Sequence, residues 1–295
     1  MPNDRNSLAV GIAAGMGAAA MGAAWQVATR FGVTAVLPPL DLAILRYGVP
    51  ALVLLPLLAR RGLWPTQAPR WLAIPIVLGA GLPFGLVAMI GAKFAPVAHM
   101  GALIPGTMPV FTALMAAVFL GEPVSPRRVA GFAAIFGGVL AIAGTSLADF
   151  GAGTWLGDLL FLAAAAIWSI YTVAFRRSGL DPWHSIALIS LASILAAIPV
   201  RLFVAGTGLP DVQPGAAAVQ FVAQGIVAGL AGTWTFSLAV RRLGAARAAL
   251  SGAFVPVLAA LGGAVILGEI PSPVVLAGIA LTIAGTLAAA WPSRS

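Results

Sequence analysis

The sequence reads LGEPVSP from Leu120 to Pro126 and LGEIPSP from Leu267 to Pro273, and the two stretches lie 147 positions apart. At the same offset, residues of the same type recur on both sides of each turn. The matched pairs include Pro109 with Pro256, Ala117 with Ala264, Gly131 with Gly278, and Gly138 with Gly285. Upstream, at an offset of 143, Trp25 matches Trp168. Self-similarity at a nearly fixed spacing predicts that the chain is a duplicated unit.

The composition places this unit in a membrane. Of the 295 residues, 61% are hydrophobic and only 8% are charged, whereas about a quarter of the residues in a soluble domain are charged. The chain has no cysteine, which excludes disulfides, thiolate metal sites and cysteine nucleophiles. Its net charge of +8 does not indicate nucleic-acid binding, because the basic residues stand in pairs between apolar runs.

Apolar runs separated by charge pairs and Pro/Gly turns predict ten helices, each near the ~20 residues that cross a hydrocarbon core. No sustained alternation of polar and apolar residues predicts a strand. The run after Arg5 is too long for the apolar region of a signal peptide, so we interpret it as the first span. The predicted spans are 8–29, 40–59, 71–91, 97–120, 128–146, 156–175, 184–204, 216–238, 243–267 and 273–291.

Basic residues give these spans an orientation. With the N-terminus inside, eleven arginines fall on the cytoplasmic side, and Arg30, Lys93 and Arg201 fall on the other side. Both termini are therefore expected in the cytoplasm. A unit of five helices enters on one side and leaves on the other, so its copy must be inverted. We expect an all-α integral membrane protein of two inverted five-helix repeats, residues 1–146 and 147–295.

Two long segments carry a resemblance to a known family. They are APVAHMGALIPGTMPVFTALMAAVFLGEPVSPRRVAGFAAIFGGVLAIAG from Ala95 and LGAARAALSGAFVPVLAALGGAVILGEIPSPVVLAGIALTIAGTLAAA from Leu243. In each, a mid-helix proline precedes an LGE turn, which resembles the EamA-type members of the drug/metabolite transporter superfamily. The resemblance covers essentially the whole chain. It implies an alternating-access transporter of a bacterial inner membrane that exports or exchanges small organic metabolites, often amino acids.

The resemblance also implies that helices 1, 3 and 4 and helices 6, 8 and 9 line a central cavity, with aromatic residues like those of aromatic amino-acid exporters. Pro109 and Pro256 each remove a helical hydrogen bond at matching positions, which favours a midplane site or a plain kink. Tryptophans near helix ends could instead anchor the protein at the membrane interface. The residues we expect to contact substrate are Trp25, Gln26, Phe84, His99, Met100, Pro109, Trp168, Tyr171, Trp234, Arg247 and Pro256, with Trp234 the preferred aromatic.

Ionisable residues inside the spans are further candidates. Arg247 could hold a substrate carboxylate or snorkel to the interface, and Arg46 could pair with Asp41 on its own helix. His99 is the side chain that could titrate usefully near neutral pH. Because no Asp or Glu falls in the central part of a predicted span, we expect facilitated diffusion or exchange without obligatory proton coupling.

Other functions stay open at this point. The family includes exporters of drugs, nucleosides or other metabolites with proton coupling, and a channel or sensor could use the same helices. An intramembrane enzyme built on Ser251 is disfavoured, because both histidines lie in other helices. Glu122 and Glu269, in the LGE turns, are expected to act as turn and cap residues. We expect a transporter that is not an enzyme, uses no cofactor or metal, binds a small metabolite in the lipid bilayer, binds no nucleic acid and functions as a monomer.

Overall fold

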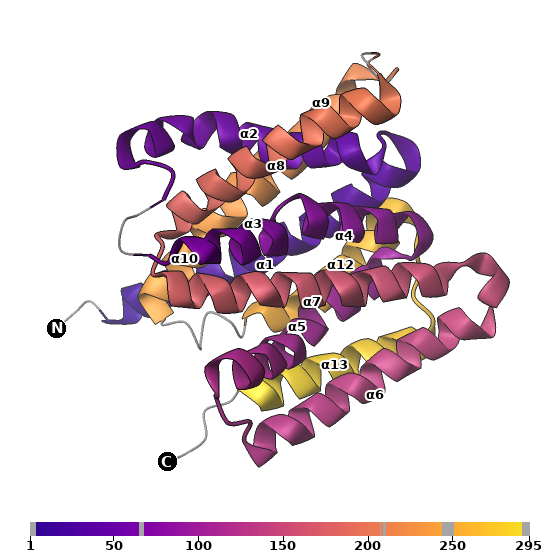
Figure 1. Ribbon diagram of the computed structural model, residues 1–295. Coiled ribbons are helices and arrows are strands. Elements are labelled where there is room, and N and C mark those ends of the chain that lie inside the picture. The colour runs from indigo at the N-terminus through magenta and orange to yellow at the C-terminus, as the bar shows by residue number, and fades with distance from the viewer. Residues whose placement is uncertain (1–3, 65–67, 207, 209–210, 244–250, 291–295) are drawn as a thin grey trace.

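The computed structural model describes residues 4–64, 68–206, 208, 211–243 and 251–290, and these ranges contain helices and no strand (Figure 1). Several spans are built from more than one helical element, because short 3₁₀ and π segments adjoin the α-helices. The elements are α1 (Asp4–Ala35), α2 (Pro39–Arg61), η1 (Arg70–Leu72), α3 (Ala73–Ala80), α4 (Leu82–Phe94), α5 (Val97–Leu120), α6 (Pro126–Ala148), η2 (Phe150–Ala152), α7 (Thr154–Ser178), α8 (Pro182–Ala205), α9 (Pro214–Gln220), η3 (Phe221–Ala231), α10 (Gly232–Leu243), η4 (Ser251–Phe254), α12 (Val255–Gly262), η5 (Gly263–Leu267) and α13 (Pro273–Ala290).

Nine helical segments of the described residues are long and apolar enough to cross a membrane. They correspond to nine of the ten predicted spans, and the first continues to Ala35, six residues beyond the predicted end. The remaining span, predicted at 243–267, is described as a shorter apolar helix from Ser251 to Leu267. α1 begins and α13 ends at the same end of the bundle (Figure 1). The protein is a multi-pass integral membrane protein.

The outer surface of the bundle is apolar. Phe203 is 91% exposed and Leu52 is 75% exposed on spanning segments, and Val265 is 83% exposed on the shorter apolar helix Ser251–Leu267. Side chains of this type, spread over the spans, would form a large apolar surface in water. They fit contact with lipid instead.

The two LGE turns have the same local structure, as their shared residues predict. Gly121 and Gly268 have φ values of 67° and 70°, the left-handed conformation that glycine adopts without a Cβ penalty. Ser125 and Ser272 then each accept a hydrogen bond from the backbone amide three residues further on. Each turn therefore ends one helix with glycine and starts the next with a serine cap.

Helices α6 and α13 lie side by side with their backbones in close contact (Figure 1). A Cβ atom built on Gly131 would lie 2.7 Å from the Gly285 carbonyl oxygen, and one built on Gly138 would lie 2.5 Å from that of Gly278. In the sequence repeat, Gly131 matches Gly278 and Gly138 matches Gly285. The contacting partners are therefore exchanged between the matched pairs, which is the arrangement expected across a two-fold axis.

The two matched prolines stand in different local structures, because the helix is continuous at Pro109 and changes from the 3₁₀ segment η4 to α12 just before Pro256. α5 continues through Pro109 without a break, and Pro256 is the second residue of α12, where a proline is tolerated. The third span is interrupted at Gly81, between α3 and α4. The eighth span contains the π-helix η3. The third helix of each predicted unit is thus irregular, and in the second unit the fourth helix is irregular as well, with the 3₁₀ segment η4 just before Pro256 and the π-helix η5 at its end.

Side chains from other helices stabilise the break at Gly81. The Tyr47 hydroxyl of α2 donates to the carbonyl oxygens of Ala80 and Gly81, at 3.1 and 2.6 Å. The Leu82 amide donates to Ser193 Oγ of α8 at 3.0 Å. Because an unpaired backbone group is costly where water is absent, these bonds are what make an interrupted helix tolerable inside the membrane.

Candidate functional site

A row of aromatic rings connects α1, α4 and α7 inside the bundle. The ring centroids of Trp25 and Phe84 lie 6.1 Å apart, and those of Phe84 and Trp168 lie 4.7 Å apart. Tyr171 continues the row, 5.1 Å from Trp168 and edge-on to it. Trp25 and Phe84 are buried, and Trp168 and Tyr171 are half-buried. The structure therefore brings together four of the predicted contact residues, including the two tryptophans that match in the repeat.

Buried amides hold one end of this row in place. The Trp25 indole N–H donates to Gln224 Oε1 of η3 at 3.0 Å, and Gln224 Nε2 donates to Thr29 Oγ1 at 3.1 Å. Gln220, one turn earlier, donates to the Ala28 carbonyl oxygen at 2.9 Å. The π-helix and α1 are thus joined by a chain of polar side chains that fixes the orientation of the Trp25 ring.

Arg46 of α2 lies over the face of the Trp25 ring, with its Cζ atom 4.3 Å from the ring centroid. Its Nε and Nη1 atoms are buried and have no hydrogen-bond partner among the described residues. The predicted pairing with Asp41 is wrong, because Arg201 Nε donates to Asp41 Oδ1 at 2.6 Å. Arg201 sits on the neighbouring α8, so a contact between helices replaces the expected contact along one helix.

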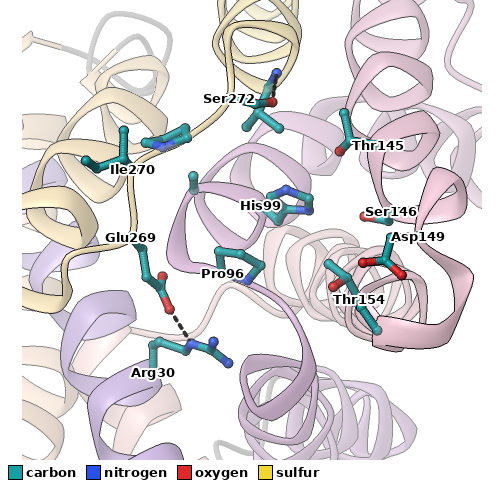
Figure 2. Close-up of a pocket in the computed structure, with 14 residues that line it drawn as sticks. Arg30, Pro96, His99, Thr145, Ser146, Asp149, Thr154, Glu269, Ile270 and Ser272 are labelled. Carbon is teal, nitrogen blue, oxygen red and sulfur yellow. Dashed lines mark hydrogen bonds and ion pairs between the residues drawn. The ribbon is translucent and has the colours of Figure 1, made fainter.

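A pocket of about 410 Å³ opens where α1 ends and α5 begins (Figure 2). At its wall, Arg30 Nε donates to Glu269 Oε1 at 2.6 Å, and Glu269 Oε2 accepts from the Val97 amide at 2.9 Å. Glu269 thus caps α5, as its predicted role requires, although α5 is not its own helix. The pocket is lined by Arg30, Pro96, Ala98, His99, Thr145, Ser146, Asp149, Ala152, Thr154, Glu269, Ile270, Pro271, Ser272 and Val275.

His99 is the predicted site residue that lines this pocket. Its Nδ1 atom lies 2.8 Å from Asp158 Oδ1 of α7, and Ser146 Oγ donates to Asp158 Oδ2 at 2.5 Å. Asp158 is only 3% exposed. Asp158 stands near the start of α7 and therefore outside the central part of its span, where no acid was expected, but it is buried against His99.

The other predicted residues are dispersed. Met100 and Pro256 are buried and Pro109 is half-buried, and Gln26 is buried with no hydrogen-bond partner for its Oε1 among the described atoms. Trp234 is 48% exposed and lies outside both the aromatic row and the pocket lining. Arg247 lies outside the described residues.

Asp158 and Arg30 are polar residues of this region that sequence reasoning missed as site residues. Each stands within one or two turns of a helix end, where acids and arginines are usually solvated or anchor a helix. The sequence holds no local signal that Asp158 would meet a histidine 59 positions away. Within the described residues, no group of three or more His, Asp or Glu side chains could hold a metal ion.

The spanning helices, with a chain of polar side chains and a row of aromatic rings inside the bundle, define a multi-pass helical membrane protein. The family model of the EamA-like transporter family matches residues 9–144 and again residues 155–291. The chain therefore belongs to the EamA-like transporter family, whose members are named as transporters and not as enzymes.

A curated relative from Streptantibioticus cattleyicolor is called "Probable terminal-alkyne amino-acid exporter" and is 32% identical over 197 residues. The match covers 64% of this chain and 63% of the relative, a little under two thirds of the relative's length. A solved structure described as "Crystal structure of protein" has a TM-score of 0.61 and 25% identity, over 97% of this chain and 98% of that chain. The fold is thus shared along nearly the whole length.

Proposed function

We propose that this transporter moves amino acids with aromatic or hydrophobic side chains out of the cell by alternating access. The observation that carries the proposal is the aromatic row from Trp25 to Tyr171 inside the bundle, with the Arg46 guanidinium over its first ring. An amino acid of this class needs an apolar surface for its side chain and a cation for its carboxylate. The name of the S. cattleyicolor relative supports the same substrate class.

Alternating access rests on two inverted five-helix repeats, residues 1–146 and 147–295. The two separate matches of one family model, at 9–144 and 155–291, support this division. The exchanged glycine contacts of α6 and α13 support a two-fold relation. A second exchange supports it too, since Arg30 of the first unit pairs with Glu269 of the second, and Arg176 of the second pairs with Glu122 of the first.

The driving force is separate from the substrate class. Uncoupled transport was expected because no Asp or Glu falls in the central part of a predicted span. Asp158 lies nearer the helix end but is buried beside His99, so this pair is a second group that a proton could use. The proposal therefore covers the substrate class and the two-sided access of one site, and flux under an imposed pH gradient decides the coupling.

An export assay tests the substrate class in cells. Cells that make the protein are loaded with phenylalanine through a phenylalanine-containing dipeptide, and we expect them to release phenylalanine faster than cells without the protein. Trp168→Ala should slow the added release about tenfold, because it removes the central ring of the row. Phe203→Ala is the matched control, since Phe203 is 91% exposed on the outer surface. Release that is unchanged by the protein, or slowed equally by both variants, contradicts the proposal.

The proposed topology places both termini in the cytoplasm of a bacterial inner membrane, with a monomer sufficient for transport. The natural absence of cysteine makes single-cysteine labelling clean. Val124→Cys and Ile270→Cys change matching turns at opposite ends of the bundle. An impermeant maleimide added to intact cells should label Ile270→Cys and spare Val124→Cys, and the reverse pattern would invert the orientation.

A further inference from the structure

Arg46 is half-buried, and two of its guanidinium nitrogens are buried in a way that the rest of the described chain does not explain. Its Nε and Nη1 atoms have no hydrogen-bond partner among the described residues, although the residue lies inside the span Pro39–Arg61. Burying a cationic donor without an acceptor is costly in an apolar medium. Although the Arg46 side chain also interacts with that of Tyr47, the unpaired Nε and Nη1 atoms indicate an acceptor that is absent from the described chain.

Asp41, the acid on the same helix as Arg46, is paired with another arginine. Asp41 accepts from Arg201, and Arg201 also donates to the carbonyl oxygens of Gly206 and Gly208, at 2.9 and 2.7 Å. The Arg30 guanidinium has both Glu269 and the Ala92 carbonyl oxygen as acceptors. Among these part-buried arginines, Arg46 is therefore the one whose inner nitrogens stay unpaired within the described part of the chain.

The position of the Arg46 guanidinium is set in advance. It lies over the Trp25 ring, and the Gln224 amide holds the indole N–H of that ring. An arginine over an aromatic face keeps the N–H groups of its edge available for a planar acid, which it can bind through two parallel hydrogen bonds. The contact with Trp25 thus orients the N–H groups of Arg46 and leaves them free to donate hydrogen bonds.

The backbone around Arg46 is irregular on both sides. Tyr47, the next residue, bonds to the carbonyl oxygens at the Gly81 break. On the other side, Gly229 of the π-helix η3 approaches the Arg46 carbonyl oxygen so closely that a Cβ atom would lie 3.1 Å from it. Interrupted helices at corresponding positions of two halves are where transporters of this kind place their substrate. Arg46 lies between the two.

We infer that Arg46 binds the carboxylate of the transported molecule, while the neighbouring rings of Trp25 and Phe84 contact its apolar side chain. The inference rests on the proposed function and sharpens it, because it names the carboxylate as the group that is recognised. Molecules that keep the ring and the ammonium group but lack the carboxylate are then poor ligands. A bidentate contact between ions accounts for at least about tenfold of affinity.

Ligand-induced thermal stabilisation of the purified protein tests this, because at a given concentration a ligand that binds the folded state more tightly raises the unfolding temperature further. The wild-type protein should bind phenylalanine at least about tenfold more tightly than phenylalaninamide. Arg46→Gln should lose this preference because it binds phenylalanine more weakly, while its affinity for phenylalaninamide changes less than about twofold. If Arg46 had only a structural role, the substitution would lower the affinity for both ligands by the same factor.

Two further variants make the result decisive. Arg177→Gln is the matched control, because Arg177 also lies over a tryptophan, 5.7 Å from the Trp71 ring centroid, but is exposed. It should keep the wild-type preference. Arg46→Lys keeps the charge without the bidentate geometry and should give an intermediate preference, which decides the case if Arg46→Gln does not fold.

The outcomes separate the two claims. A wild-type protein that binds neither ligand contradicts the proposed substrate class. A wild-type protein that binds phenylalanine, together with an Arg46→Gln or Arg46→Lys variant that retains the full preference over phenylalaninamide, overturns the role of Arg46 and leaves the substrate class standing.

Discussion

At the scale of single residues, the structure corrects the sequence most where partners come from distant helices. Trp25 and Trp168 could be singled out because they match in the repeat, and both belong to the aromatic row. The partner of Arg46 could not be predicted, because an acid five positions away on the same helix is the obvious candidate. Only the packing of α2 against α8 shows that Asp41 forms its ion pair with Arg201.

Asp158 gives a residue-scale prediction about stability. Asp158→Ala removes the partner of both His99 Nδ1 and Ser146 Oγ, and each buried group left unpaired costs about 1–3 kcal/mol. We expect a clearly lower midpoint of thermal unfolding in detergent. Asp149→Ala is the control, because Asp149 lines the same pocket but is exposed. Equal unfolding midpoints for the two variants would show that the buried pair contributes nothing to the fold.

At the scale of helices, turns and spans were predictable, because their signals are local. The glycine, serine and proline of each LGE turn act within a few residues of their own position. The interruption at Gly81 was not predictable, because the backbone groups that it leaves unpaired form hydrogen bonds with Tyr47 and Ser193 from two other helices. Pro109, the stronger local signal for a break, lies in a continuous helix.

The contact of α6 with α13 gives a prediction at this scale. Gly138→Ala would press a methyl group against the Gly278 carbonyl oxygen, 2.5 Å away, where neither backbone can easily move. We expect a loss of about 1–3 kcal/mol, as for other overpacked contacts. Gly137→Ala, one position earlier, meets nothing within 4 Å and should be neutral or slightly stabilising. Thermal unfolding of both variants measures the difference, and equal losses would contradict the close packing of these two helices.

At the scale of the whole molecule, two ion pairs link the proposed repeats at opposite ends of the bundle. The Arg30–Glu269 pair is largely buried, with side chains 18% and 19% exposed, whereas those of the Arg176–Glu122 pair are 51% and 40% exposed. An exposed pair contributes at most about 1 kcal/mol, and a more buried pair is screened less. The two ends are therefore held together with unequal strength.

This inequality predicts a difference in access. Glu269→Gln should favour the form that is open at the Arg30 end, so a cysteine placed at the buried, pocket-lining Ala98 should react faster with maleimide. Glu122→Gln, the matching change at the other end, should not raise that rate. An unchanged rate at position 98 in the Glu269→Gln background would show that the ion pair does not hold this end closed.

Counterflow of radiolabelled phenylalanine in proteoliposomes, with and without an imposed pH gradient, decides whether this protein is an amino-acid carrier. We expect saturable uptake of label into liposomes preloaded with unlabelled phenylalanine, because one site serves both sides of the membrane. A dependence on the gradient would assign proton coupling, and its absence would assign exchange. No counterflow from folded, reconstituted protein would contradict an amino-acid carrier.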